Sequence, residues 1–339
     1  MLYFLNDYTE GCHPRVLQAL TETNLVSQPG YGDDIYCAAA AEKIAACCGG
    51  DVDVRFLTGG TQANLVALST LLRRYEAVIA AETGHISVHE AGAIEFSGHK
   101  VVTLPSHAGK LDALELKDYM ARFYADATHE HMPIPGAVYI SQPSELGTLY
   151  AKAELEALRA ICDQWGLRLY VDGARLGYGL MSPACDLTLP ALARLADAFT
   201  VGGTKVGALC GEALCFRNGA PRGFFTMQKQ QGALLAKGRL VGVQFDALFT
   251  DGLYWDISRR AIEQAMALKA AFAEKGYPLF ADSPTNQQFV ILTEEQKERL
   301  EKDAAFGVWE PLSDGRVAVR FVTSWATRPE DVAALKALL

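Results

Sequence analysis

The sequence lacks a surplus of positive charge. Its 31 Lys and Arg residues are outnumbered by 40 Asp and Glu residues, which leaves a formal net charge of −9 at pH 7. A protein that binds nucleic acid in general needs a basic footprint on its surface. The composition therefore argues against a nucleic-acid partner, although a small anionic ligand could still bind in a local basic pocket.

Long apolar runs are absent as well. No stretch reaches the roughly 18 residues that a membrane-spanning helix needs. The first residues, MLYFLNDYTEG, contain an acidic side chain and no basic one, which is unlike a secretory signal peptide. We therefore expect no membrane partner and a cytoplasmic location.

Cysteine is too scarce for a disulfide framework, with eight residues in a chain of 339. No CxxC pair occurs, and Cys12 with His13 has no further ligands at the spacing of a metal site. These cysteines lie beside apolar or Ala-rich runs, as small buried side chains do. We expect a reducing compartment and no bound metal.

The common nucleotide-binding motifs are also missing. There is no GxxxxGK[ST] sequence, and no GxGxxG follows an early strand. The glycines of DGARLGYG, at 173, 177 and 179, have the wrong spacing. The sequence thus argues against a P-loop or a dinucleotide site.

What is present is an alternation of strand and helix patterns. Helical periodicity occurs at Gln62–Arg74 and Lys152–Trp165. Short β-rich runs lie at Val54–Leu57, Val78–Ala80, Val101–Leu104, Ala137–Ile140, Arg168–Val171, Phe199–Val201 and Ala213–Phe216. Strand and helix in series predict an α/β fold, a mostly parallel central sheet covered by helices on both faces.

The last third of the chain has a different pattern. One long helix is expected near Gln244–Lys275, followed by strands at Gln288–Leu292 and Arg316–Val322. Thr327 and Glu330 have the spacing of a capping box before a final helix. We predict a large α/β domain with an N-terminal arm at 1–245 and a small C-terminal α+β domain at 246–339.

A glycine loop joins the first predicted strand to a helix. In LTGGTQAN, two glycines allow a ligand to approach the backbone, and Thr61 adds a hydroxyl at the start of the helix. Free N–H groups at a helix N-terminus bind anions such as phosphate. Taken alone, the same loop is compatible with an ordinary tight turn and cap.

Two further segments place reactive side chains at strand ends. Asp172 follows the apolar run LYV, where strands of an open α/β sheet deliver residues to a ligand crevice. Lys205 follows a Gly-Gly turn among small uncharged residues, which would lower its pKa and suit it to form a Schiff base. A helix cap for Asp172 and a surface position for Lys205 are the ordinary alternatives.

Together, a phosphate cradle, an aspartate and a lysine in this order suit an enzyme that uses pyridoxal 5'-phosphate (PLP). The motifs GYGDDIY, GGTQAN, GHISVHEAGA, DGARLG and GGTK resemble those of the low-specificity L-threonine aldolases. The resemblance spans roughly residues 3 to 325. It implies the aspartate-aminotransferase fold (fold type I), in the branch shared with β-eliminating lyases.

The resemblance implies roles for the cofactor-binding residues. Lys205 would link to the aldehyde of the cofactor, and Asp172 would hold its ring nitrogen protonated. His85 would stack on the ring and could handle protons. The phosphate would lie at Gly60 and Thr61.

It also implies the groups that surround the substrate. Arg175 and Arg320 would bind the substrate carboxylate, and Asn6 would line the site. Tyr31 and Arg239 resemble residues that complete the site of a neighbouring subunit, and Arg239, like Arg175, would also contact the cofactor, Arg239 near its phosphate. The implied working unit is a homodimer or homotetramer with shared active sites.

One departure concerns the substrate hydroxyl. Many members of the family carry a histidine in an ENTHN-like segment, whereas this chain has SQPSE, with Pro143 in the corresponding place. The residue that recognises the hydroxyl is therefore unassigned. Glu145 could act there or simply begin the next loop, and Glu90 could support the site or cap a helix.

The expected activity is retro-aldol cleavage of L-threonine, allo-threonine or a related β-hydroxy-α-amino acid to glycine and an aldehyde. His85 or His89 would act as the base. Another PLP reaction, either β-elimination or transamination, remains open because only the choice of broken bond separates them. A third possibility is a protein of this fold that has lost catalysis and serves in binding.

Overall fold

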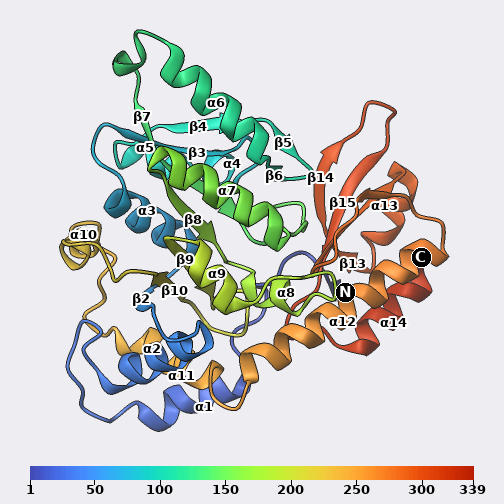
Figure 1. Cartoon of the computed structure of the whole chain (residues 1–339). Coiled ribbons are helices and arrows are strands. Elements are labelled where there is room, and N and C mark those ends of the chain that lie inside the picture. Colours follow the sequence, from blue (N-terminus) through green and yellow to red (C-terminus); the bar gives the residue numbers. More distant parts are fainter.

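The computed structural model describes residues 1–339 and has the predicted α/β architecture, with a twisted central sheet as its largest element (Figure 1). The sheet has seven strands in the order β2-β10-β9-β8-β7-β3-β4. Five of them pair in parallel, and β10 runs antiparallel to both β2 and β9. The strands are β2 (Asp53–Leu57), β3 (Glu76–Ala81), β4 (Val101–Leu104), β7 (Ile134–Ser141), β8 (Arg168–Asp172), β9 (Ala198–Gly202) and β10 (Glu212–Phe216).

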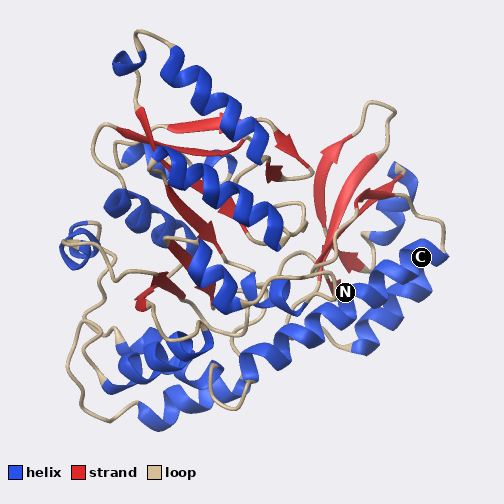
Figure 2. Ribbon diagram, viewed as in Figure 1, coloured by secondary structure: helices blue, strands red, loops and turns tan.

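Helices cover both faces of this sheet (Figure 2). Alternate residues of β7 show the reason, since Val138 and Ile140 pack into one core cluster and Tyr139 packs into another. The helices of this part are α1 (Pro14–Thr23), α2 (Ile35–Cys47), α3 (Gly60–Leu71), α4 (His85–Val88), α5 (Ala93–Phe96), α6 (Ala113–Ala125), α7 (Lys152–Trp165), α8 (Leu176–Met181), α9 (Leu189–Leu195), α10 (Phe224–Gln230) and α11 (Arg239–Leu248).

All seven predicted strands of the central sheet are present, with ends that differ by no more than three residues. The helix predicted at 152–165 has those bounds as α7, whereas the one predicted at 62–74 begins and ends earlier, as α3. Gly59 is the N-cap of α3. The helix therefore starts directly at the glycine pair.

The C-terminal part forms a second, antiparallel sheet of four strands in the order β11-β12-β15-β14. The N-terminal arm joins it, because β1 (Leu2–Tyr3) pairs with β13 (Ala304–Ala305) and Phe4 packs into the same core. The division at residue 245 falls inside α11 and stays a prediction. The elements are β11 (Leu279–Ala281), β12 (Gln287–Leu292), β14 (Gly307–Pro311), β15 (Val317–Val322), α12 (Leu253–Glu274), α13 (Glu294–Leu300) and α14 (Pro329–Leu338).

Small elements complete the chain. A hairpin and a 3-10 turn lie between β4 and β7. They are β5 (Ser106–His107), β6 (Lys110–Leu111) and a single turn at His129–His131.

Two local predictions are wrong. The helix expected at 244–275 is broken between α11 and α12, where Asp251 and Gly252 both have positive φ, at 53° and 73°. The capping box at Thr327 does not form, because α14 begins at Pro329 with Arg328 as its N-cap. The Thr327 hydroxyl instead accepts a hydrogen bond from the backbone N–H of Ser324, at 2.8 Å.

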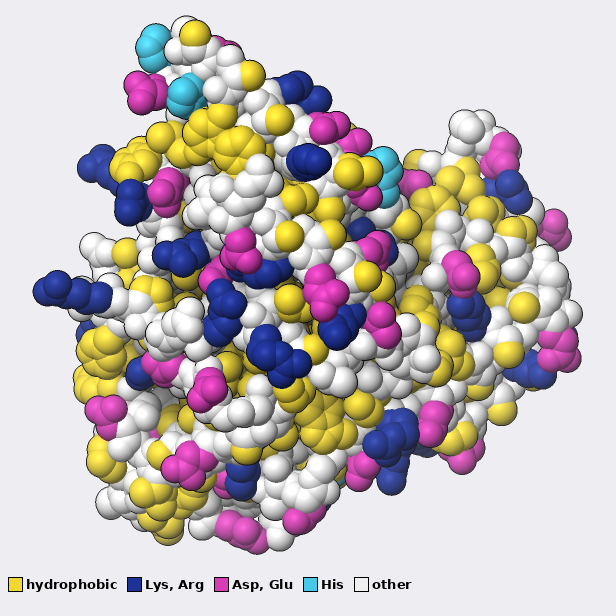
Figure 3. Space-filling model, in the orientation of Figure 1, with side chains coloured by type: hydrophobic (Ala, Val, Ile, Leu, Met, Phe, Trp, Pro, Cys, Tyr) yellow, Lys and Arg dark blue, Asp and Glu magenta, His cyan; other side chains and the backbone are white.

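The face of the molecule drawn in Figure 3 has no basic footprint of the kind that nucleic-acid binding needs. On the face drawn in Figure 3, acidic and basic side chains are interspersed, and no continuous basic stripe crosses it. No helix of the structure combines the length and the apolar character required to cross a membrane.

Candidate active site

The carboxyl ends of the parallel strands and the first turn of α3 meet at one small cavity. Seven of the residues singled out from the sequence lie in its wall: Gly60, His85, Pro143, Glu145, Asp172, Arg175 and Lys205. The remaining wall residues are Ser141, Ser144 and Ala174. The cavity thus joins residues that are up to 145 positions apart in the sequence.

Glycines bring Asp172 and Lys205 to the same place. The backbone N–H of Gly202 donates to the carbonyl of Gly173 at 3.0 Å, which ties the ends of β8 and β9 together. A Cβ on Gly173 would lie 2.0 Å from the carbonyl oxygen of Thr200, and one on Gly202 would lie 2.2 Å from that of Ala174. Only glycine allows this approach, which explains Gly173 of DGARLG and Gly202 of GGTK.

Asp172 is buried and fully hydrogen-bonded. Its Oδ2 accepts from Asn64 Nδ2 and from the Tyr139 hydroxyl, each at 2.8 Å, and its Oδ1 accepts from the Ala174 N–H at 2.9 Å. Burial alone would raise the pKa of Asp172, but nearby His85 and these hydrogen bonds hold the pKa below its usual value. The residue is therefore a permanent anion in the cavity wall.

His85 is held by a buried carboxylate. Its Nδ1 lies 2.7 Å from Glu90 Oε1, and the same oxygen accepts from Asn64 Nδ2 at 2.6 Å. Burial opposes protonation, but the Glu90 hydrogen bond and the charge of Asp172 raise the pKa of His85 above its usual value. The amide of Asn64 thus joins Glu90 and Asp172 into one hydrogen-bonded network. These bonds hold the side chains of His85, Glu90 and Asp172 close together.

Lys205 has the environment of a reactive amine. Burial and the nearby Arg175 guanidinium lower the pKa of Lys205. The carboxylates of Asp7, Asp172 and Glu212 act in the opposite direction without cancelling this shift. A lowered pKa increases the fraction of neutral amine, the form that attacks an aldehyde.

Arg175 is fixed by an acidic residue of the N-terminal arm. Its Nε and Nη2 donate to the two oxygens of Asp7, at 2.7 and 2.9 Å, and Asn286 Nδ2 donates to Asp7 at 2.9 Å. Asp7 is completely buried. Its bidentate bond orients the guanidinium in the cavity wall.

Arg320 lies on β15, outside the wall of the cavity. Its Nη1 donates to Gln287 at 3.1 Å, its guanidinium lies over the Trp309 ring at 5.8 Å, and its Nε is buried without a partner. Burial and the positive charge of Arg175 lower the pKa of Arg320. The two guanidinium groups are thus near enough for their charges to interact.

The start of α3 fits a phosphate group. Gly59, the N-cap, makes no side-chain hydrogen bond to the first turn, so the N–H groups of that turn have no cap. A Cβ on Gly59 or on Gly60 would meet no atom within 4 Å, so there is open space beside the Cα atoms of both glycines. Thr61 follows on the exposed side of the turn. With anionic Asp172 and the Lys205 amine nearby, the cavity has the donor set that PLP requires.

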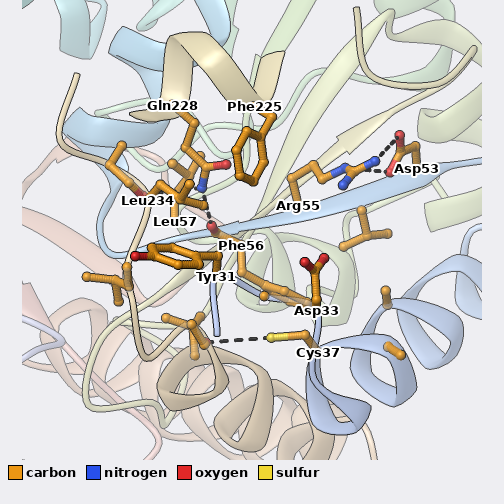
Figure 4. Close-up of a pocket in the computed structure, with 18 of the residues that line it drawn as sticks. Tyr31, Asp33, Cys37, Asp53, Arg55, Phe56, Leu57, Phe225, Gln228 and Leu234 are labelled. Carbon is orange, nitrogen blue, oxygen red and sulfur yellow. Dashed lines mark hydrogen bonds and ion pairs between the residues drawn. The ribbon is translucent and has the colours of Figure 1, made fainter. Parts of the chain in front are cut away.

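Four further predicted residues, Thr61, Tyr31, Arg239 and Asn6, are not in the cavity wall of this single chain. Tyr31 lines a separate pocket with Phe56, Phe225 and Leu234, as Figure 4 shows. Arg239 donates to the backbone carbonyls of Thr23 and Val26.

Asn6 lies in the arm, one residue before Asp7, where its Oδ1 accepts from the Tyr8 N–H at 2.9 Å. The roles expected of Asn6, Tyr31 and Arg239 remain predictions.

Sequence reasoning missed Asn64, Tyr139 and Asp7. Asn64 was within reach, because it closes the GGTQAN motif and is a polar residue among apolar helix positions. Tyr139 stands in a strand as any buried aromatic residue would, and its contact with Asp172 spans 33 positions. Asp7 has no local signal that points to Arg175, 168 positions away.

Comparisons with known proteins agree with this geometry. The family model of the β-eliminating lyases matches residues 5–328. A low-specificity L-threonine aldolase from a Pseudomonas species is 31% identical over 338 residues, which cover 98% of this chain and 96% of the relative.

Solved structures agree as well. A Leishmania major threonine aldolase superposes with a TM-score of 0.95 at 44% identity and covers 100% of this chain and 99% of its own. An aspartate aminotransferase double mutant from Thermus thermophilus shares the fold at a TM-score of 0.69 and 14% identity, over 100% of this chain and 90% of its own. The fold is therefore that of the fold type I enzymes, as expected, and the cofactor is PLP. The chain belongs to the β-eliminating lyase family, in its threonine aldolase branch.

Proposed function

We propose that the protein cleaves L-threonine, L-allo-threonine or a related β-hydroxy-α-amino acid to glycine and an aldehyde. The observation that carries the proposal is the single cavity that contains the Lys205 amine, the Asp172 carboxylate and the His85 imidazole. The family and its relatives support the same activity.

The cofactor contacts follow from the donors around the cavity. The first turn of α3, with Gly60 and Thr61, would hold the phosphate, Asp172 would pair with the ring nitrogen, and Lys205 would take the aldehyde. When bound there, PLP supplies an electron sink that stabilises negative charge at Cα of the substrate. A carboxylate of lowered pKa suits a protonated ring nitrogen.

Arg175 and Arg320 would position the substrate. A guanidinium binds a carboxylate by parallel hydrogen bonds, so Arg175, already oriented by Asp7, presents a fixed direction for the incoming group. Fixing the carboxylate determines which bond of Cα is aligned for cleavage. Orientation by these two residues would thus select cleavage of the Cα–Cβ bond.

His85 would hold and move protons beside the reacting carbon. Its Nδ1 is bound to Glu90, which leaves Nε2 for the reacting groups and keeps the ring in one orientation. His89 lies 5.5 Å from His85 between ring centroids, and partial burial lowers the pKa of His89. The pKa of His85 is raised, so His85 keeps its proton to a higher pH than His89 does.

We also propose that the working unit is a homodimer or homotetramer with shared sites. Tyr31, with φ of 63° and an exposed ring, lines an apolar pocket between α2, β2 and α10 (Figure 4). Large apolar side chains near Arg239 are exposed as well, namely Leu25, Val26, Ile35 and Leu240. An apolar surface of this kind suits a contact between two copies of the chain.

A cytoplasmic location is part of the proposal. All eight cysteines are unpaired in the structure. Free cysteines suit a reducing compartment.

The experiment that tests the function is a proton NMR time course of the PLP-loaded protein with L-threonine. Glycine and acetaldehyde should appear together, and the Lys205→Ala variant should produce neither. A 2-oxo acid released with ammonia would instead identify a β-eliminating lyase, and an amino-group transfer to an added 2-oxo acid would identify an aminotransferase. Loss of colour in Lys205→Ala, measured by absorbance, would report the lysine linkage separately.

A further inference from the structure

Glu145 lies in the loop after β7, in the wall of the candidate active site. It lines the same cavity as His85, Asp172 and Lys205. Its Oε1 accepts two hydrogen bonds, from the Ser141 hydroxyl at 2.6 Å and from the His85 backbone N–H at 2.9 Å. Both bonds end on the same oxygen, so the carboxyl group is fixed while Oε2 is left for a ligand.

The contacts of Glu145 differ from those expected of a residue that only begins the loop. A residue that only began the loop would bond within its own turn, as Glu145 does with Ser141, whereas its second bond reaches across to α4 at His85, 60 positions away. Burial raises the pKa of Glu145, and the hydrogen bond from Ser141 opposes this shift without cancelling it. A carboxylate with a raised pKa is a stronger base than an exposed one.

Most other polar groups near the cavity are engaged within the chain, and His85, which keeps Nε2 free, has a raised pKa that favours its protonated form over a proton acceptor. The Nδ1 of His85 is bound to Glu90, and both oxygens of Asp172 are hydrogen-bonded within the chain. Pro143, also in the wall, has no polar side-chain atom. His89 is exposed and is not part of the wall.

We propose that Glu145 is the catalytic residue that binds the substrate β-hydroxyl through Oε2 and removes its proton. The inference rests on the proposed function and names the group that recognises the hydroxyl. In the cleavage direction the hydroxyl proton passes to Oε2, and the Cβ–O bond becomes the carbonyl of the aldehyde. The Cα–Cβ bond breaks, its electron pair stays on Cα, and a proton taken up there gives glycine.

Glu145→Gln is the decisive variant, because glutamine keeps an oxygen for Ser141 and the His85 N–H but cannot accept the proton. We expect cleavage of L-threonine by the PLP-loaded variant to fall by about 10²- to 10⁴-fold. Exchange of the glycine α-proton with solvent deuterium needs the same cavity but no hydroxyl. This exchange, followed by NMR, should stay close to the rate of the unmodified protein.

Two measurements other than activity test whether the substitution damages cofactor binding or the fold. Cofactor absorbance and the thermal unfolding midpoint of Glu145→Gln should match those of the unmodified protein. Glu156→Gln, at an exposed position on α7, is the matched control and should change nothing. If Glu145→Gln does not fold, Ser141→Ala decides, because loss of one orienting bond should slow cleavage and spare exchange.

Two results would overturn the assignment. Unchanged cleavage in Glu145→Gln would leave His85 or His89 as the base, and an equal fall in cleavage and exchange would mean that Glu145 only positions His85. Failure of the proposed function looks different. In that case the unmodified protein would exchange the glycine α-proton but cleave no β-hydroxy-α-amino acid.

Discussion

Arg175 donates two parallel hydrogen bonds to Asp7, from Nε at 2.7 Å and from Nη2 at 2.9 Å. Asp7 also accepts from Asn286 at 2.9 Å. One carboxylate therefore joins the N-terminal arm, the segment after β8 and the start of β12. The arginine expected to bind the substrate is positioned by residues from both ends of the chain.

Asp7→Asn should destabilise the protein and weaken its substrate binding. The substitution leaves the Arg175 charge buried without its counter-charge, which costs about 3 kcal/mol or more. We expect the free energy of unfolding, measured with urea, to fall by this amount. The KM for the amino acid should rise, because the guanidinium loses its fixed orientation.

The matched control is Asp251→Asn, which breaks the exposed ion pair of Arg15 with Asp251 at 2.9 Å. Exposed pairs contribute at most about 1 kcal/mol, and asparagine tolerates the positive φ of position 251. An equal fall in the free energy of unfolding of the two variants would contradict the role given to Asp7.

Glu90→Gln should lower the free energy of unfolding, and this loss should be larger in mildly acidic solution than in alkaline solution. Glu90 raises the pKa of His85 in the folded protein. A histidine whose pKa is raised by folding stabilises the fold fully below its unfolded pKa, about 6.5. This stabilisation is lost as the pH rises through the pKa of the folded protein. Denaturation at about pH 6 and about pH 9 should show the larger loss at the lower pH.

An NMR titration of the His85 ring should show its pKa falling in Glu90→Gln. The control is Glu115→Gln, which removes the exposed partner of His107 at 3.5 Å. If Glu90→Gln lowers the free energy of unfolding equally at both pH values, the His85–Glu90 pair acts only through packing.

Glu212→Gln should stabilise the protein in alkaline solution. Burial raises the pKa of Glu212 from its usual 4.5 to about 8, even though Lys205 acts in the opposite direction. The unfolded chain ionises this carboxyl at a lower pH than the folded protein does. Between the unfolded and the folded pKa, Glu212 therefore lowers the free energy of unfolding by roughly 1.4 kcal/mol for each rise of about one in pH.

Urea denaturation at about pH 5 and about pH 9 measures this effect. Glu212→Gln should match the unmodified protein at the lower pH and exceed it at the higher one. Two parallel stability curves would show that Glu212 ionises normally in the folded protein.

Gly60→Ala should weaken cofactor binding without harming the fold. A Cβ at this position meets no atom of the chain within 4 Å, and alanine favours the helix more than glycine does. The added methyl group would, however, enter the space expected for the phosphate. We expect the Kd for PLP to rise by about tenfold or more, with an unchanged or higher unfolding midpoint. An unchanged Kd would place the phosphate elsewhere.

The elements of the central sheet could be predicted because their signals are local. β7 and β8 contain short apolar runs, AVYI and LYV, and α7 repeats its apolar positions at helical spacing. The break between α11 and α12 was missed, since two apolar helical patterns continue across it. The start of α14 was missed because Pro329 suits the first helical position better than Thr327 suits a cap.

The α/β fold, the strand ends that carry Asp172 and Lys205, and the glycine pair before α3 could be predicted from the sequence, because each of these depends on neighbouring residues. The pairing of the charges, in contrast, follows from tertiary packing. Asp7 reaches Arg175, and Asn64 joins Glu90 to Asp172, through contacts between distant segments. Such contacts set the pKa values and orientations in the cavity, and they depend on how the elements pack rather than on the order of residues along the chain.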